Sequence, residues 1–167
     1  MPTQVLIPSG ALGLNYDKVA LDRGIAMKPD IIAIDGGSTD SGPAYLGRGV
    51  SKYSRASTKI EWRGLMEARA KAGVPLVIGT SGTCGADDAV DWMLDITREI
   101  AADLRQNLKI AVLRCSQDTA VMSTAFCDGR ITPLPAAPKV SAQDFTSCTN
   151  IVALAGAEQI AAALETG

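Results

Sequence analysis

Short apolar segments alternate with longer segments of helical periodicity along most of the chain. The apolar segments have the length of buried strands, and several are followed by Gly, Pro or Ser. The pattern therefore predicts strands at 4–7, 31–34, 74–78, 108–113 and 150–154. Between and after them it predicts helices at 15–27, 58–72, 86–105, 116–126 and 156–165.

The helix expected over 86–105 has the clearest pattern. Its apolar residues, among them Met93 and Ile100, recur on one face at a period of 3.6 residues. Asn15 is a suitable N-cap for the first helix, and Gly73 is placed to end the second. These end markers support the helical assignments.

Strands that alternate with helices imply right-handed βαβ units. The sequence thus predicts an α/β fold with an open, mostly parallel sheet of about five strands and helices on both faces. This is a Rossmann-like three-layer arrangement in a single domain over 1–167. The stretch 128–147, with its TPLPAAP segment, interrupts the alternation. It is expected to be a surface connection or, alternatively, a lid over the substrate.

Composition narrows the chemistry available to the 167-residue chain. Sixteen Lys and Arg against eighteen Asp and Glu give a formal net charge of −2, which argues against bulk electrostatic binding to nucleic acid or acidic membranes. The chain has no histidine, which excludes a Ser-His-Asp triad, a Cys-His dyad and a His-ligated metal site built from its own residues. Proton transfer must therefore use Asp, Glu, Lys, Cys or Tyr.

The four cysteines form no CxxC pair and are irregularly spaced, which favours free thiols in a reducing compartment. The first residues, MPTQVLIPSG, do not resemble a signal peptide, and no apolar run is long enough to cross a membrane. A cytoplasmic protein without nucleic-acid or membrane partners is expected.

Polar loops follow three of the expected strands, at 35–43, 79–88 and 114–118. Ligands of open α/β sheets bind outside the carboxyl ends of the strands. The three loops are therefore expected to form one site, although each alone is a weak indication.

The glycine-rich loop at 79–85 matches neither GxGxxG nor a Walker motif. It could bind an anionic group or a developing oxyanion through backbone N–H and hydroxyl donors. The alternative is a tight strand-to-helix turn in which two following aspartates complement the helix dipole. The candidate anion-binding residues are Gly79, Thr80, Ser81, Gly82 and Thr83.

Asp35 and Asp40 flank the Gly-Gly turn after the second expected strand. Either carboxylate could act as an acid or base, or help to hold a hard cation such as Mg²⁺, whereas the alternative is an Asx turn. Asp40 is the main acid or base candidate, and Ser38 and Thr39 are candidate substrate ligands. Two carboxylates alone do not predict a metal site.

Cys115 follows an expected strand and opens an expected helix, where a helix N-terminus and Arg114 would lower a thiol pKa. The alternative is an inert buried cysteine. Asp118, in the same loop, is a candidate substrate ligand. In the basic stretch 48–63, Arg55 and Lys59 could hold a phosphate or carboxylate, such as the nucleotide part of coenzyme A, unless the stretch is only a solvated face.

Several blocks resemble the amino-terminal part of the acyclic terpene utilisation (AtuA-like) family. They are IDGGSTDSGPAYLG at 34–47, SKYSRASTK at 51–59, GVPLVIGTSGTCGADDAVDW at 73–92 and CSQD at 115–118. The resemblance implies an α/β fold and a role in the catabolism of acyl or terpenoid acids through coenzyme A thioesters. Family chains normally continue past the position of Gly167, which implies a small subunit or the amino-terminal half of a larger protein.

Together these features predict a component of a lyase, hydratase or hydrolase that acts on a small organic acid or its acyl-CoA thioester. Coenzyme A is expected as part of the substrate, and a divalent cation stays open as a cofactor. A larger second subunit or a homo-oligomer is the expected partner. The alternatives are a non-catalytic subunit that completes a partner's fold or active site, and a metabolite-binding module.

Overall fold

A small open parallel sheet forms the centre of the fold in the computed structural model, which describes residues 2–37 and 41–166. Its strands are β1 (Val5–Leu6), β2 (Ile31–Asp35) and β3 (Leu76–Gly79), in the order β1-β2-β3. Both pairings are parallel, with Ile32 of β2 opposite Leu6 and Leu76, so all three strands run in the same direction. The expected parallel α/β sheet is confirmed at this level.

Helices connect and follow the strands. The first begins at Lys18 rather than at 15, because the Asp17 side chain accepts hydrogen bonds from the N–H groups of Val19 and Ala20, whereas Asn15 has a φ of 62°. Gly73 ends the third helix, as expected, with a left-handed φ of 69°. The helices are α1 (Lys18–Ala26), α2 (Gly42–Arg48), α3 (Arg55–Ala72), α4 (Asp87–Leu104), α5 (Thr119–Cys127), α6 (Ala142–Ser147) and α7 (Ala157–Glu165), with a 3-10 turn, η1 (Ser81–Thr83).

The hydrophobic core lies on one face of the sheet. Ile32 and Ile34 point into it from alternate positions of β2, and helices α1, α3 and α4 cover them. The opposite face of β2, with Ile31 and Ala33, is only half-buried. The helical residues of the core include Leu21, Trp62, Leu65, Met66, Met93, Ile96 and Ile100.

The fourth and fifth expected strands do not form. Residues 106–115 are extended without regular structure, and Val152 makes only an isolated antiparallel bridge with Ser116. Leu108 packs against the core, but Ile110 and Val112 remain 43% and 37% exposed. A β-branched segment becomes a strand when its side chains are packed on both faces of a sheet, and here they are not.

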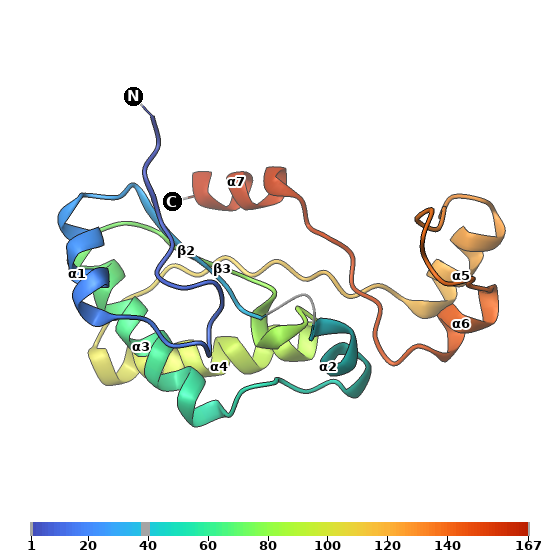
Figure 1. Cartoon of the computed structure of the whole chain (residues 1–167), viewed down its shortest axis with the longest axis horizontal. Helices are drawn as coiled ribbons and strands as arrows, with labels where there is room; N and C mark the ends of the chain where they lie inside the picture. The colour runs from blue at the N-terminus through green and yellow to red at the C-terminus, as the bar shows by residue number, and fades with distance from the viewer. Residues whose placement is uncertain (1, 38–40, 167) are drawn as a thin grey trace.

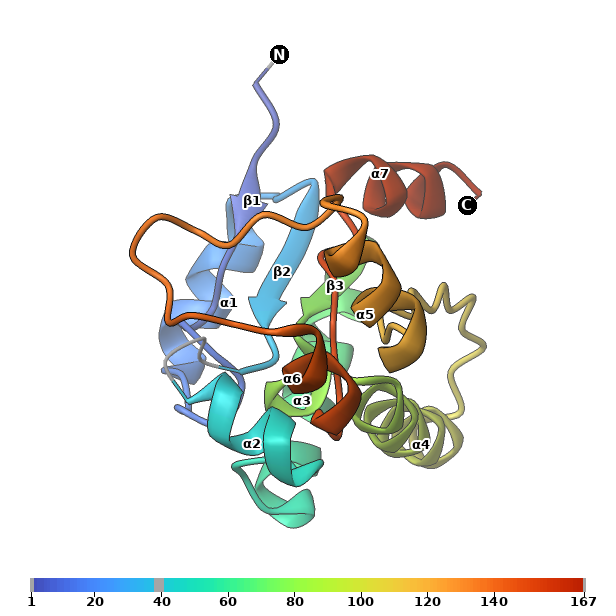
Figure 2. The ribbon, with the colours of Figure 1, turned by 90° about the vertical axis from the view of Figure 1, so that its right-hand side faces the viewer.

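The helices of the carboxyl-terminal third lie apart from this core. Helices α5 and α6 pack on each other, with the rings of Phe126 and Phe145 5.1 Å apart, at the end of the molecule remote from α1 (Figure 1). A long connection separates helix α7 from α6, as both views show (Figure 2). Of residues 106–166, all of which are described, Ala125 is the one buried side chain. The expected layer of helices on the second sheet face is therefore not packed into the core.

The stretch 128–147, expected as a surface connection or a lid, is mostly exposed and ends in the short helix α6. It begins with a reciprocal capping box in which Ser141 and Asp144 bond to each other's backbone N–H groups. Over 2–37 and 41–166, no helix combines the length and hydropathy that a membrane crossing needs.

Candidate functional site

The loops after β2 and β3 touch backbone to backbone. The N–H of Gly36 donates to the Gly79 carbonyl at 2.6 Å, and the N–H of Thr83 donates to the Gly36 carbonyl at 3.2 Å. A Cβ atom on Gly37 would lie 2.2 Å from the Cα of Thr83. The Gly-Gly pair is therefore required by the close approach of the second loop.

The loop after β3 has an unusual backbone conformation. Thr80 and Thr83 have φ values of 48° and 81°, in the left-handed region that β-branched residues rarely adopt. Thr83 is fully buried, and its hydroxyl accepts a hydrogen bond from the Lys52 N–H at 3.0 Å and lies 3.3 Å from the Ser51 hydroxyl. Such conformations cost about 1–3 kcal/mol each, persist only where the surroundings hold them, and cluster at functional sites.

Several backbone N–H groups of this loop already donate hydrogen bonds within the protein. The N–H of Thr83 bonds to Gly36, and those of Cys84 and Gly85 both bond to the Ser81 carbonyl. Gly82 packs so closely on α4 that a Cβ would lie 2.7 Å from that of Ala89. Anion binding by this loop would therefore have to use donors other than these three N–H groups.

The first turn of α4 holds the third loop. The Asp87 carboxylate accepts hydrogen bonds from the N–H groups of Cys115 and Ser116 at 3.2 and 3.1 Å, and the Asp87 N–H donates to the Ser116 hydroxyl at 2.9 Å. Arg114 pairs with Asp91, with a contact of 3.1 Å, and this hydrogen bond lowers the pKa of the Asp91 carboxyl. The 114–116 segment is thus tied to the same edge of the sheet as the other two loops.

Cys115 does not lie at a helix N-terminus, contrary to the expectation from the sequence. Helix α5 begins at Thr119, and Asp118 is its N-cap, accepting from the Val121 N–H at 2.9 Å. Cys115 therefore precedes the helix by four residues, and its neighbour Arg114 is already ion-paired. All four cysteines are free, as the irregular spacing predicted.

Arg55 and Lys59 are engaged between helices. Arg55 on α3 forms two hydrogen bonds with Glu99 on α4, and Lys59 contacts the same carboxylate at 3.1 Å. The hydrogen bond from Arg55 has the largest effect and that from Lys59 the next, and together they lower the pKa of Glu99 to about 2. Lys52 is placed differently, because it is exposed and its Nζ donates to the Ser41 hydroxyl at 3.1 Å, beside the glycine-rich loops.

Asp35 forms the Asx turn given above as an alternative, because its carboxylate accepts the Gly37 N–H at 3.0 Å. The other predicted residues of this loop, Ser38, Thr39 and Asp40, lie outside the described residues. Within the part of the chain that is described, no three His, Cys, Asp or Glu side chains are grouped to hold a metal ion.

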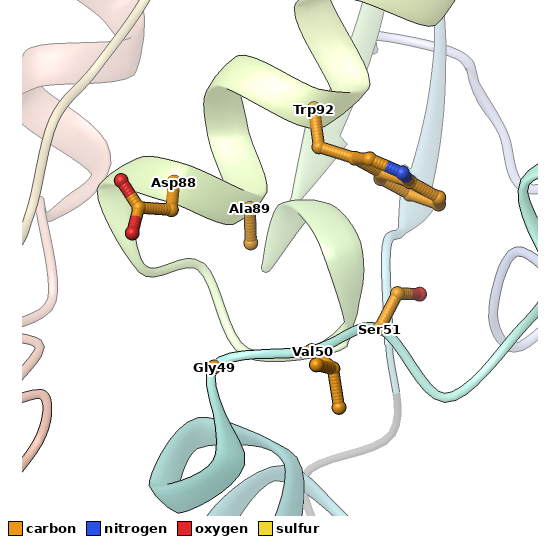
Figure 3. Close-up of a pocket in the computed structure, with 6 residues that line it drawn as sticks. All are labelled: Gly49, Val50, Ser51, Asp88, Ala89 and Trp92. Atoms are coloured by element: carbon orange, nitrogen blue, oxygen red, sulfur yellow. The ribbon is translucent and has the colours of Figure 1, made fainter.

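A pocket of about 250 Å³ opens beside these loops, between residues 49–51 and the first turns of α4. The side chain of Trp92 projects over Ser51, Ala89 lies behind it, and the Asp88 carboxylate is turned away from Trp92 (Figure 3). Sequence reasoning missed Ser51 and Trp92 as site residues. A tryptophan that follows a polar loop, beside the apolar face of a helix, could have pointed to the pocket.

Comparison with known proteins does not identify the function of this site. No family model, curated protein or solved structure matches it. The chemistry of the site therefore comes from its own residues: buried and half-buried hydroxyls, the exposed Lys52 ammonium group and the apolar side chains of Trp92 and Ala89.

Proposed function

We propose that the protein is a component of an enzyme that acts on a small organic acid or its coenzyme A thioester. The reaction type is that of a lyase, hydratase or hydrolase, and the site is the loop junction around Thr83. The observation that carries the proposal is the strained backbone of Thr80 and Thr83, held in place beside a pocket at the carboxyl edge of the sheet.

The pocket suits the acid portion of such a ligand. Its volume of about 250 Å³ lies below the usual range for drug-sized ligands, so a coenzyme A nucleotide would remain outside. Trp92 and Ala89 would contact an apolar carbon skeleton, and the Ser51 hydroxyl could hydrogen-bond a carbonyl oxygen. Lys52, the next residue in the chain, supplies the positive charge that a carboxylate needs.

Asp40 is the proposed acid or base. Asp35 is less suitable, because its carboxylate is used in the turn that contacts Gly37. The residues on either side of 38–40 belong to the site, since Gly37 touches Thr83 and Ser41 receives Lys52. Asp40 lies between Gly37 and Ser41 in the sequence, and we assign it the acid or base role on that ground.

Fluorescence of Trp92 provides a direct test. Small carboxylic acids and their coenzyme A thioesters are titrated into the protein; Trp62 is buried and bonded to Thr97, so it should give a constant background. An acid that binds should change the emission of the wild type but not of Trp92→Phe. Lys52→Met should weaken binding about 10- to 100-fold, the scale of a charge-assisted hydrogen bond.

Arg55→Met is the matched control, because Glu99 already holds its guanidinium group. It should leave the affinity within about twofold of the wild type, since no ligand contact is lost. If Arg55→Met weakens binding as much as Lys52→Met does, the anion site lies along α3 and the proposed placement is wrong. If no acid or thioester in the panel binds, the proposed substrate class is wrong.

A further inference from the structure

A short chain of hydrogen bonds connects residues 51–53 to Thr83 at the wall of the pocket. The Lys52 N–H donates to the Thr83 hydroxyl at 3.0 Å, and the hydroxyl oxygens of Thr83 and Ser51 lie 3.3 Å apart. The Tyr53 N–H in turn donates to the Ser51 hydroxyl at 3.3 Å. Thr83 is fully buried, whereas Ser51 is half-buried and lines the pocket. Of the two hydroxyls, only that of Ser51 can therefore meet a ligand.

The donor of the hydrogen bond between Ser51 and Thr83 follows from counting protons and lone pairs. A hydroxyl group has one proton to donate and two lone pairs that accept. The Thr83 proton is shielded from water, and over residues 2–37 and 41–166 the Ser51 oxygen is the one acceptor within hydrogen-bonding distance of it. A buried donor without an acceptor is costly, so Thr83 donates and Ser51 accepts.

This direction leaves the Ser51 hydroxyl with a single role toward a ligand. Its oxygen accepts from Thr83 and from the Tyr53 N–H, which uses both lone pairs, and its own proton has no acceptor among the described residues. Its side chain lies on the Trp92 side of the 49–51 segment, opposite to that of Val50 (Figure 3). We propose that Thr83 is a positioning residue that fixes the Ser51 hydroxyl as a hydrogen-bond donor into the pocket, so that Ser51 selects ligand oxygens that carry no proton.

This inference rests on the proposed function and narrows it. A carboxylate oxygen or a thioester carbonyl accepts the Ser51 proton, whereas an ammonium group would bring a second donor to the same place and is rejected. Ser51 is also a poor nucleophile, because attack needs a free lone pair and a base for the proton. Over 2–37 and 41–166, no side-chain base is hydrogen-bonded to it. Ser51 therefore stabilises negative charge on a substrate oxygen and does not form an acyl-enzyme.

The first experiment tests the direction of the bond in the full chain without ligand. NMR at low temperature measures the exchange of side-chain hydroxyl protons with water, and nuclear Overhauser contacts assign them. The Thr83 proton should exchange slowly and lie near the β-protons of Ser51. Ser51→Ala should speed this exchange about 5- to 10-fold, the scale of one neutral hydrogen bond. Ser57→Ala is the matched control, on a serine of α3 that does not line the pocket, and should leave the exchange unchanged.

The second experiment measures binding, with butanoate as the probe and Trp92 fluorescence as the signal. Ser51→Ala should weaken binding about 10- to 100-fold, the scale of a hydrogen bond to a charged group. Thr83→Val keeps the branched shape without the hydroxyl and should weaken binding at least about 3-fold, whereas Thr83→Ser should restore the wild-type affinity. In the Ser51→Ala background, Thr83→Val should have no further effect, because Thr83 acts on the ligand only through Ser51. A loss that ran through the Lys52 N–H or through distortion of the loop would be additive instead.

The outcomes separate this inference from the proposed function. A slowly exchanging Ser51 proton in place of the Thr83 proton, or fast exchange at both residues, would overturn the inference. Additive losses, or butanoate binding that Ser51→Ala leaves unchanged, would also overturn it while the proposed function stands, because the acid still binds. If butanoate does not bind the wild type although the Thr83 proton exchanges slowly, the proposed function is wrong and the donor role of Thr83 is confirmed. Should Thr83→Val not fold, proton exchange in the wild type and in Ser51→Ala decides the inference.

Discussion

Replacing Gly37 with alanine tests whether the loops after β2 and β3 are packed as closely as the site requires. The new Cβ would lie 2.2 Å from the Cα of Thr83 and 2.6 Å from its carbonyl oxygen, whereas ordinary contacts begin at 3.4 Å. The nearest blocking atoms all belong to the backbone of Thr83, so a side-chain rotation cannot relieve the clash. The β3 loop must instead move by more than an ångström.

The cost follows from what this movement disrupts. Overpacking of a close contact costs about 1–3 kcal/mol. Displacing Thr83 also weakens its N–H bond to Gly36 and the bond from the Lys52 N–H to its hydroxyl, each worth about 1 kcal/mol. We therefore expect Gly37→Ala to lower the free energy of unfolding by about 3 kcal/mol, a large part of the 5–15 kcal/mol of a typical domain.

Urea unfolding followed by tryptophan fluorescence and circular dichroism measures this change. Gly47→Ala is the control, because a Cβ there meets nothing within 4 Å and Gly47 lies in the last turn of helix α2. It should leave the free energy of unfolding within about 0.5 kcal/mol of the wild type. If Gly37→Ala lies within about 0.5 kcal/mol of the wild type, the loops are not in contact and the site as described does not exist.

Two further predictions concern charged groups. The pKa of Glu99 is lowered to about 2, below its ordinary value of 4.5, so its ion pairs stabilise the fold fully above about pH 4.5 and lose this contribution as the pH falls towards 2. The stability difference between the wild type and Glu99→Gln should therefore shrink from pH 6 to pH 2 in urea unfolding, and an unchanged difference would contradict this pairing. Asp87→Ala should increase hydrogen exchange at the amides of Cys115 and Ser116, which lose their acceptor, while Asp88→Ala serves as the control. Equal exchange in the two variants would show that Asp87 does not hold the 114–116 segment.

Local sequence features were sufficient for most of the core elements. The apolar run at 31–34 and the helical period at 86–105 correspond to β2 and α4, and Ile32, Met93 and Ile100 from these segments are buried in the core. Gly73 marked a helix end because a left-handed backbone is easiest for glycine. The segments at 108–113 and 150–154 were wrongly expected as strands. Their apolar residues have strand propensity, but whether a strand forms depends on neighbours that these segments do not pack against.

The candidate site, like the fold, could be predicted from the sequence only in part. The sequence placed polar loops after β2 and β3, and the parallel sheet brings them together because strands of one direction end at one edge. It could not tell which cations stay available, since Arg55 and Lys59 are neutralised by Glu99, 40 or more positions further along the chain. For Trp92 the sequence held only an indirect signal, its position after a polar loop, and the pocket itself is seen only in the structure. Composition and periodicity thus determined the α/β fold class and placed polar loops at one edge of the sheet. Only the packing of α3 on α4 decided that Arg55 and Lys59 are paired, because these contacts join residues that are distant in sequence.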